Sequence, residues 1–522
     1  MLTDHAPKTL PETAVAEARA DNRRWLPLLF FLIPLLYLLL RAPAIGHYLG
    51  DADHGYQLGV GRQLLLGKLP FKDVFIHYGP LTAYTCMLAL RIWDSPLSES
   101  IVCCAAYAAA LFFLGTILNR RANMAIAASG VIGGLLLVAR FHKWWYWLCP
   151  LICMYLVDKY ASGKRQKLFS VLLGIMIVVG GLYRLDIGAA CFVAGITGQI
   201  LMNVASRRAK CAGLPWLVAG IGTAALVWFS FLGWQSGWNA IGDYISFSLA
   251  GIFTQVKNVH RVPPLHLVLT TCSVLLTYFV ALGICLRMVS RTSDSSDRVN
   301  AMACAVASVF GICLIPQAIH LFQADHLVTV IPPFIITTGI LAARLAERNR
   351  RKDFPVSRLA VMAYCLVLLV VCCRTHPGKD LSSFSRLRGR YAELAGGIHS
   401  RPDDPSVQMI EAAQRMTRPQ DRVLVLPQGG SQPIQMYNFL ERPMSGVVAI
   451  QWGGVFTENQ WRLRSIASIK RDPPTIVVAG SDFIYRSGPW WQKWYPELYA
   501  YVRDNYRKIA YRRDGWLILC RQ

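Results

Sequence analysis

Residues 50–81 read GDADHGYQLGVGRQLLLGKLPFKDVFIHYGPL and directly follow an apolar run, residues 25–40, that is typical of a membrane-spanning helix. The stretch places Asp51, Asp53 and His54 where the chain leaves this apolar run. Charged side chains are costly in contact with lipid, so groups of this kind usually face water, a partner or a substrate. The stretch therefore indicates a functional loop beside a membrane.

The whole chain is too apolar for a soluble protein of its size. Of its 522 residues 54% are hydrophobic and only 16% are charged, and the mean hydropathy is +0.36. Apolar runs of about 16–20 residues recur, each long enough to cross a bilayer. We predict a polytopic α-helical membrane protein with about eleven spans and a small C-terminal α/β domain. The candidate spans are residues 25–45, 99–118, 122–139, 144–158, 168–183, 188–205, 214–233, 265–286, 299–317, 327–343 and 357–374.

The net charge of +24 lies largely in short basic clusters between these spans. Such clusters mark the cytoplasmic side of a membrane protein, and anionic membrane lipids are sufficient partners for them, so we expect no nucleic acid. The clusters are Arg120–Arg121, Lys164–Arg165–Lys167, Arg207–Arg208–Lys210, Arg287–Arg291–Arg298 and Arg344–Arg348–Arg350–Arg351–Lys352.

One further apolar run, residues 79–93, has about 14 residues and is short for a crossing. If it crosses, Arg120–Arg121 cannot lie on the same side as Arg23–Arg24; if it stays in the interface, every basic cluster falls inside. We therefore predict that it does not cross, that the N-terminus is cytoplasmic and that the C-terminal domain lies outside the cytoplasmic (inner) membrane.

This topology divides the chain into a cytoplasmic segment 1–24, a transmembrane domain 25–374 with a first outer loop 46–98, and an extracytoplasmic domain 375–522. In the last part, RVLVLPQGG and PPTIVVAG predict buried strands, and SVQMIEAAQRM and ELYAYVRDNYRKI have helical periodicity. AYRRDGWLILCRQ carries a hairpin signal, Asp-Gly between two apolar runs. The segment PWWQKWYPELY is interpreted as core or membrane contact in preference to a sugar-stacking surface.

Mixed acidic, basic and histidine side chains gather on the predicted outer face, where we expect a site for a charged substrate. These are Asp51, Asp53, His54, Asp73 and His77 in the first loop; Arg140, His142 and Lys143; Arg184 with Asp186; Asp243, Lys257, His260 and Arg261; and Asp325 with His326.

Asp51 and Asp53 flank a single alanine and have three interpretations. Two such carboxylates can share a divalent cation, Mg²⁺ or Mn²⁺, through oxygen ligands. One of them can act instead as a general base toward a hydroxyl. The third interpretation is a solvated loop in which Asp caps the helix that begins near Gly55 and ends before Gly67.

The aromatic residues of this region have equally open interpretations. Phe71, Phe75 and Tyr78 alternate with polar residues, which fits an amphipathic element in the membrane interface, or else anchoring at the membrane surface alone. Trp144–Trp147 follow the basic stretch Arg140–Lys143, a pattern typical of an interfacial aromatic belt with snorkelling cations, or else of a lipid-phosphate clamp.

Two polar pairs at predicted span ends are also ambiguous. Arg184 either pairs with Asp186 or binds an anionic substrate, and Asp325–His326 lie in QADHLVTVIPP. The sequence contains no GxxxxGK[ST], GxSxG, HExxH or GxGxxG motif, which argues against a nucleotide-driven enzyme or a serine or zinc hydrolase.

The first loop resembles that of the GT-C glycosyltransferases. The pattern D-H-G-Y, then L-L-x-G-x-x-P-F-x-D and Y-G-P-L, is similar to the bacterial branch that includes protein O-mannosyltransferases and lipid A aminoarabinose transferases. Phe71 stands where that branch often has Tyr, Asp73 takes the Asp place, and His54 departs from the usual Glu. QADHLVTVIPP also looks like that branch.

The resemblance implies an inverting glycosyltransferase that moves a sugar from a polyprenyl-phosphate carrier to a lipid, glycan or protein acceptor on the outer face of the membrane. By its spacing to Gly67 and Pro70, Asp53 takes the role of the family's first-loop base. Asp51 is its partner or a second metal ligand, since His54 is a poorer ligand than Glu for a hard cation.

Such a transfer also needs cations that hold the phosphate leaving group. The candidates for substrate or phosphate binding are His54, Asp73, His77, Arg140, His142, Lys143, Arg184, Lys257, His260, Arg261, Asp325 and His326. Two alternatives remain open: a transporter or flippase of a lipid-linked saccharide, and a non-catalytic subunit of a cell-envelope assembly complex.

Overall fold

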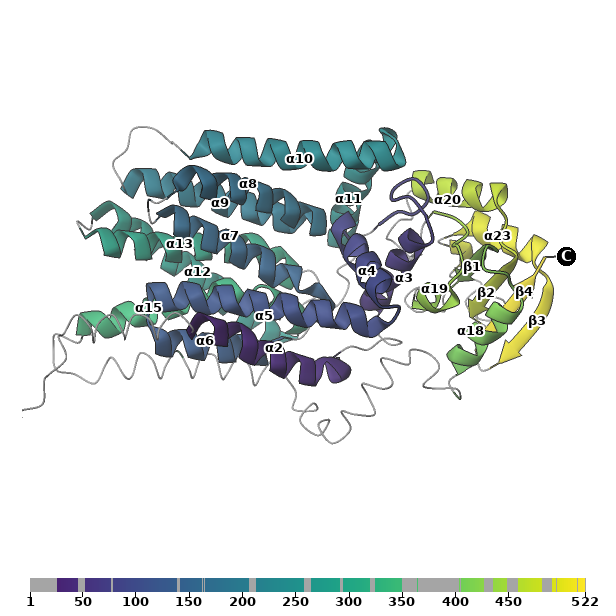
Figure 1. Ribbon diagram of the computed structural model, residues 1–522, viewed down its shortest axis with the longest axis horizontal. Coiled ribbons are helices and arrows are strands. Elements are labelled where there is room, and N and C mark those ends of the chain that lie inside the picture. The colour runs from purple at the N-terminus through teal and green to yellow at the C-terminus, as the bar shows by residue number, and fades with distance from the viewer. Residues whose placement is uncertain are drawn as a thin grey trace, which may run out of the picture.

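The computed structural model contains a long helix bundle, an α/β domain and a junction of short helices between them (Figure 1). It describes residues 26–45, 52–76, 78–138, 141–161, 163, 165–205, 213–257, 264–291, 294–319, 324–349, 364, 403, 405–426, 435–447, 459–480, 491–493, 495–513 and 515–521.

The bundle helices run roughly along the long axis of the molecule (Figure 1). They are α2 (Leu26–Ile45), α5 (Pro96–Arg121), α6 (Met124–Leu136), α7 (Trp145–Ala161), α8 (Gln166–Tyr183), α9 (Leu185–Ala205), α10 (Leu214–Ser236), α12 (Leu265–Arg291), α13 (Ser295–Ile319) and α15 (Ile331–Asn349). In the described part of the chain, six of these are long and apolar enough to cross a membrane: α5, α8, α9, α10, α12 and α13. Four further predicted spans fall on the helices α2, α6, α7 and α15, and the span at 357–374 lies outside the described residues except for Tyr364.

Local sequence explains how these helices begin and how closely they pack. In α5 the Ser95 side chain accepts a hydrogen bond from the Leu97 N–H at 3.2 Å, Pro96 occupies the first turn, and basic residues occupy the last turn. Helices α8 and α10 approach through glycine: a Cβ on Gly220 would lie 2.2 Å from the Val171 carbonyl oxygen.

The junction consists of α3 (Ala52–Leu65), α4 (Pro80–Ile92), the 3-10 helix η1 (Phe141–Lys143), α11 (Asn239–Lys257) and α14 (Ala324–Thr329). The ambiguous run 79–93 forms α4, which lies beside α3 at the end of the bundle that faces the α/β domain (Figure 1). The helix predicted to end before Gly67 is α3, and Gly67 has the positive φ, +85°, that favours glycine at this position.

The α/β domain has a four-stranded sheet in the order β1-β2-β4-β3. Its strands are β1 (Val423–Leu426), β2 (Ile476–Gly480), β3 (Lys508–Arg513) and β4 (Trp516–Cys520), and its helices are α18 (Pro405–Arg415), α19 (Gln435–Leu440), α20 (Asn459–Arg471) and α23 (Pro496–Asn505). β1 and β2 are parallel, whereas β4 is antiparallel to both β2 and β3. The predicted strands, helices and hairpin are therefore confirmed, and Trp491 and Tyr495 lie in the core as expected.

Successive residues of β1, β2 and β4 are buried against two different cores, which explains why these strands are apolar throughout. One core lies inside the α/β domain around Trp491. The other is shared with the first loop and α11, and it contains Phe71, Phe75 and Tyr78. These three rings are at most 4% exposed, so their interpretation as an interfacial element was wrong.

Buried hydrogen bonds join the same surfaces. The Gln63 side chain of α3 donates to the Arg442 carbonyl oxygen at 2.9 Å and accepts from the Met444 N–H at 2.6 Å. The Phe75 N–H donates to the Val447 carbonyl oxygen at 2.7 Å. The first loop therefore forms the base on which the α/β domain rests.

Candidate functional site

Two of the predicted cations converge on one aromatic ring at the end of the bundle that faces the α/β domain. The Lys143 Nζ lies 5.2 Å and the Arg184 Cζ 5.8 Å from the ring centroid of Tyr78. Lys143 ends η1, Arg184 lies in the turn between α8 and α9, and Tyr78 belongs to the first loop. Cations at this distance from a ring face are attracted by its quadrupole, so Tyr78 holds two positive charges near one point.

Asp186 balances part of this charge and orients Arg184. Its Oδ1 lies 3.0 Å from the Arg184 Nε, and its Oδ2 accepts hydrogen bonds from the Tyr146 hydroxyl at 3.4 Å and from the Gln317 amide. The pair is largely enclosed, with the Arg184 side chain 11% and the Asp186 side chain 21% exposed. Arg184 therefore pairs with Asp186, as one of its two interpretations predicted. It also lies over the Tyr78 ring, which Lys143 contacts too.

His326 joins the same network through the main chain of Gln317. Its Nδ1 lies 3.2 Å from the Gln317 carbonyl oxygen, and the imidazole is buried. His142 is also buried, next to Lys143 in η1. The name cation cluster is used for Lys143 and Arg184, which contact Tyr78, together with Asp186, Gln317 and His326, which are linked to Arg184 through successive polar contacts.

Gln317 was missed by sequence reasoning. It stands in GICLIPQAIH, residues 311–320, where a polar amide directly after Pro316 interrupts an apolar run. An uncharged polar residue inside a membrane helix usually has a partner within the protein, so this position carried a usable signal.

The tryptophans predicted as an aromatic belt instead pack inside the protein beside the cation cluster. Trp145 stacks on Tyr183 with 5.8 Å between ring centroids, and Trp144 meets the same ring edge-on at 4.9 Å. Trp144, Trp145 and Trp147 are at most 5% exposed. The belt interpretation was therefore wrong for these three residues, which pack in the protein core and not against lipid.

Asp53 lies in the first turn of α3, one turn before Tyr56. The Tyr56 hydroxyl donates to the Phe75 carbonyl oxygen at 3.2 Å, and its ring meets Tyr78 edge-on at 6.0 Å. The helix whose first turn contains Asp53 is thus anchored beside the Tyr78 ring.

The other predicted site residues differ in how far the structure describes them. Asp53, His54, Lys257 and Asp325 lie in helices, but their side chains are outside the described set. Asp51, His77, Arg140, His260 and Arg261 lie outside the described residues altogether.

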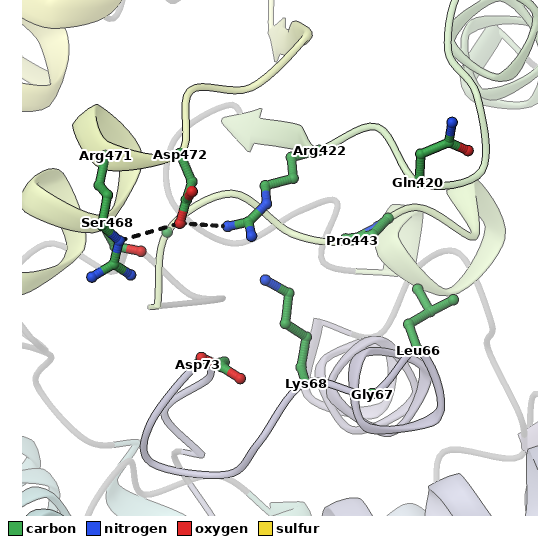
Figure 2. Close-up of a pocket in the computed structure, with 11 residues that line it drawn as sticks. Leu66, Gly67, Lys68, Asp73, Gln420, Arg422, Pro443, Ser468, Arg471 and Asp472 are labelled. Atoms are coloured by element: carbon green, nitrogen blue, oxygen red, sulfur yellow. Dashed lines mark hydrogen bonds and ion pairs between the residues drawn. The ribbon is translucent and has the colours of Figure 1, made fainter. Parts of the chain in front are cut away.

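Asp73 is placed away from the cation cluster, in a hollow between the first loop and the α/β domain (Figure 2). Its Oδ2 accepts a hydrogen bond from the Leu69 N–H at 3.0 Å. Lys68, Arg422 and Asp472 line the same hollow and were not predicted, because residues so distant in sequence give no local signal of their proximity.

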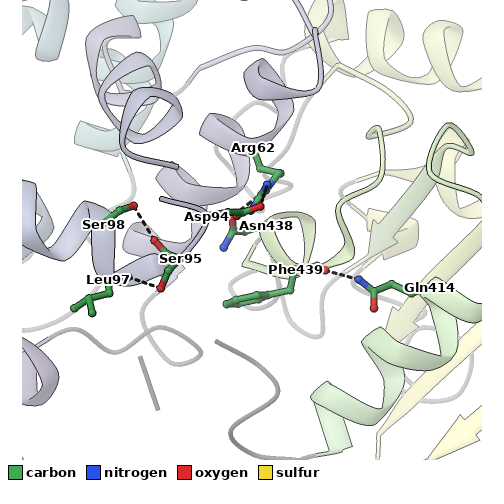
Figure 3. Close-up of polar contacts among 8 residues, drawn as sticks. All are labelled: Arg62, Asp94, Ser95, Leu97, Ser98, Gln414, Asn438 and Phe439. Carbon is green, nitrogen blue, oxygen red and sulfur yellow. Dashed lines mark hydrogen bonds and ion pairs between the residues drawn. The ribbon is translucent and has the colours of Figure 1, made fainter. Parts of the chain in front are cut away.

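Arg62 ties the junction to both neighbouring parts (Figure 3). Its Nη1 donates to the Asp94 Oδ2 at 3.1 Å in the turn between α4 and α5, and its Nε donates to the Asn438 Oδ1 at 3.3 Å in α19. The arginine is 6% exposed, so these contacts hold α3 against the bundle and the α/β domain together.

Within the described residues no group of three His, Cys, Asp or Glu side chains is arranged to hold a metal ion. The predicted ligands, Asp51 and the Asp53 carboxylate, are outside that set. The divalent cation therefore stays a prediction from the spacing of Asp51 and Asp53, and no chemical step is derived through it.

Comparison with known proteins gives structural likeness alone. No family model and no curated protein matches the sequence. ArnT from Cupriavidus metallidurans in the apo state matches with a TM-score of 0.52 at 15% identity, over 96% of this chain and 98% of that chain. The same protein bound to undecaprenyl phosphate gives a TM-score of 0.51 at 11% identity, over 94% and 97%. The archaeal oligosaccharyltransferase AglB from Archaeoglobus fulgidus, in complex with an inhibitory peptide and a dolichol-phosphate, gives 0.50 at 11%, over 96% and 74%.

The chain has the GT-C fold. This confirms the fold class and the resemblance expected from the first loop, and the chain is an integral membrane protein. At 11–15% identity the likeness is one of fold, so the chemistry rests on this chain's own residues.

Proposed function

We propose that the protein is an inverting glycosyltransferase that moves a sugar from a polyprenyl-phosphate carrier to a hydroxyl of an acceptor. The observation that carries the proposal is the convergence of Lys143 and Arg184 on Tyr78, beside the helix that begins with Asp53, in a chain of GT-C fold. A phosphate leaving group needs this kind of cationic site, and the acceptor needs a base nearby.

In the proposed reaction an acceptor oxygen forms a bond to the anomeric carbon while the bond from that carbon to the phosphate oxygen breaks. The acceptor proton passes to the Asp53 carboxylate, with Asp51 as its partner. The leaving phosphate keeps the bonding electron pair and gains negative charge. Lys143 and Arg184 stabilise this charge, which develops during transfer and so lowers the barrier selectively.

Asp186 has a positioning role in this proposal. It already accepts hydrogen bonds from Tyr146 and Gln317 and pairs with Arg184, so the guanidinium is held in one orientation before the carrier arrives. Asp186 compensates one of the two positive charges, so the five described members of the cation cluster carry a net positive charge, which suits a phosphate.

We further propose the orientation and the division into domains. The transmembrane domain comprises residues 25–374 with the first outer loop 46–98, and the domain 375–522 lies outside the cytoplasmic membrane. Support comes from the ends of the helices: Arg120 and Arg121 pair with Asp158 at the end of α5 far from the α/β domain, whereas the cation cluster lies at the near end (Figure 1).

The proposed donor is a lipid-linked sugar whose polyprenyl chain lies along the bundle, and the acceptor is a lipid, glycan or protein. Undecaprenyl phosphate and dolichol-phosphate in the two similar proteins support a carrier of this class. A divalent cation, Mg²⁺ or Mn²⁺, at Asp51 and Asp53 is proposed from the spacing of these two carboxylates and is open to test by chelation.

The test measures sugar transfer from a mixture of polyprenyl-phosphate sugars to membrane extracts by the full-length protein. Asp53→Asn is compared with wild type, and Asp504→Asn serves as the matched control because Asp504 is an exposed carboxylate in α23. We expect a loss of about 10²–10⁴-fold for Asp53→Asn alone. Transfer by Asp53→Asn equal to that of wild type and Asp504→Asn would remove Asp53 from catalysis. Transport of a lipid-linked saccharide without any sugar transfer would favour the flippase.

A further inference from the structure

The polar hollow that contains Asp73 lies between the first loop and the α/β domain (Figure 2), and it shares no lining residue with the cation cluster. Its volume is about 320 Å³. The loop after α3 contributes Lys68 and Asp73, the residue before β1 contributes Arg422, and the end of α20 contributes Arg471 with Asp472 next to it. Its walls thus come from both parts of the molecule, and it exists only when they are assembled.

Lys68 is the residue of the hollow best placed to bind a ligand. Its side chain is half-buried and extends into the hollow toward Arg422 and Asp472 (Figure 2). Among the residues that the structure describes, the Lys68 ammonium forms no hydrogen bond and no ion pair. Burial and, after it, the nearby Arg422 guanidinium lower the pKa of Lys68, and together they outweigh Asp73 and Asp472, which act to raise it.

The two carboxylates of the hollow already have partners. The Asp472 Oδ2 lies 3.0 Å from the Arg422 Nη1 and 3.3 Å from the Arg471 Nε. Burial acts to raise the pKa of Asp472, but these two arginines hold it below its usual value. Asp73 accepts the Leu69 N–H. Three cationic side chains against two carboxylates give the described lining of the hollow one net positive charge, and Lys68 is the cation there that forms no ion pair with a described residue.

The volume limits what can bind. Ligand pockets for small molecules measure about 300–1,000 Å³, and this hollow lies at the lower end of that range. It suits a group of monosaccharide size. Ser468 also lines the hollow, and a hydroxyl is the kind of group that hydrogen-bonds sugar hydroxyls.

We propose that this hollow binds a sugar-sized group that carries a phosphate or a carboxylate, with Lys68 as the partner of the anionic oxygen. The site would select the acidic part of the acceptor while the acceptor hydroxyl reaches Asp53. This assignment of acceptor class rests on the proposed function, but the binding site itself does not.

The experiment is calorimetric binding to the full-length protein in detergent. The probes are glucose 6-phosphate, glucuronate, inorganic phosphate and, as the neutral reference, glucose. The variants are Lys68→Met, Lys68→Arg and the control Lys72→Met, which removes an exposed lysine four residues away that lies outside this hollow. Thermal unfolding without ligand checks that each variant is folded.

We expect both acidic sugars to bind, glucose not to bind, and inorganic phosphate to bind more weakly than glucose 6-phosphate. Lys68→Met should weaken binding of the acidic sugars about tenfold or more, since a hydrogen bond to a charged group is lost. Lys68→Arg should retain most of the affinity, and Lys72→Met should change it less than about twofold.

Absence of acidic-sugar binding, or an equal loss in Lys68→Met and Lys72→Met, would overturn the proposal. Equal affinity for inorganic phosphate and glucose 6-phosphate would overturn the assignment to a sugar-sized ligand. Because the measurement uses no transfer, Asp53→Asn should bind the same probes as wild type. A failure of the hollow and a failure of the transferase are thereby distinguished.

Discussion

Replacing Gln63 by methionine removes a single buried amide that joins α3 to the α/β domain. The amide donates to the Arg442 carbonyl oxygen and accepts from the Met444 N–H, and Gln63 is fully buried. Methionine has nearly the same shape and volume, so packing is largely retained while both hydrogen bonds are lost.

The expected cost follows from the two main-chain groups left without their partner. A buried donor or acceptor left unsatisfied costs about 1–3 kcal/mol, so Gln63→Met should destabilise the docked α/β domain by about 2–6 kcal/mol. Since 1.4 kcal/mol corresponds to a factor of ten, the open population should rise at least roughly 30-fold.

Hydrogen–deuterium exchange reads this directly, because the Met444 amide is itself one of the two bonded groups. Exchange in the peptide that contains residues 435–447 should accelerate in the full-length protein in detergent. The control is Gln57→Met in the same helix. Gln57 is 1% exposed, and its amide nitrogen has no hydrogen-bond partner within the described part of the chain. Its replacement should therefore be neutral or stabilising, and unchanged Met444 exchange in Gln63→Met, or equal costs for both variants, would refute the reasoning.

Three further changes test other parts of the structure. Gly79→Ala should destabilise the protein by about 1–3 kcal/mol, because its Cβ would lie 2.0 Å from the Leu182 carbonyl oxygen. The control in thermal unfolding is Gly222→Ala, whose Cβ would meet nothing within 4 Å. An equal loss of stability in the two variants would contradict the prediction. Because the pKa of Lys68 is lowered, the unfolded chain holds more protons than the folded one as pH approaches 10.5. Wild type should therefore gain stability relative to Lys68→Met as pH rises through this window. A difference in unfolding free energy between the two proteins that stays constant or falls with pH would speak against this. Chelation of divalent cations should abolish sugar transfer, with recovery on addition of Mg²⁺ or Mn²⁺, whereas full activity after chelation would remove the cation from the proposal.

The α/β domain could be predicted from sequence because its signals are local. Asp-Gly at a hairpin and short apolar runs ending in glycine act over a few residues, and β1, β2 and the β3–β4 hairpin lie where these signals placed them. The same holds for α3, whose end before Gly67 is fixed by a residue that tolerates positive φ.

The first-loop aromatics were misinterpreted because their partners are remote in the chain. Phe71 packs edge-on against Tyr244 at 5.2 Å between centroids, and Phe75 packs against Phe247 at 5.0 Å. An alternation of aromatic and polar residues looks the same whether the apolar side meets lipid or another helix, so the sequence pattern does not separate the two cases.

The sequence predicted which residues belong to the candidate site better than it predicted how they are arranged in space. Lys143, Arg184 and His326 were each selected as polar groups at the end of an apolar run, which is a signal that a single sequence carries. Their grouping around Tyr78 and Gln317 depends on how helices pack in three dimensions. The hollow around Lys68 was not predicted for the same reason, because it forms only where Asp73 and Arg422, which are distant in sequence, come together.

The burial of the first loop beneath the α/β domain sets an order of events during biosynthesis. Arg442, which accepts a hydrogen bond from Gln63, lies 379 residues further along the chain. At about 5–20 residues per second, translation of that interval takes roughly 20–75 s. Throughout this time the core that Phe71, Phe75 and Tyr78 share with the α/β domain is incomplete, although α11, which supplies Tyr244 and Phe247, is synthesised earlier in the interval. A ribosome that stops before β4 would therefore leave this shared core without Trp516 and Ile518, so chains truncated there should be prime targets for quality-control proteases.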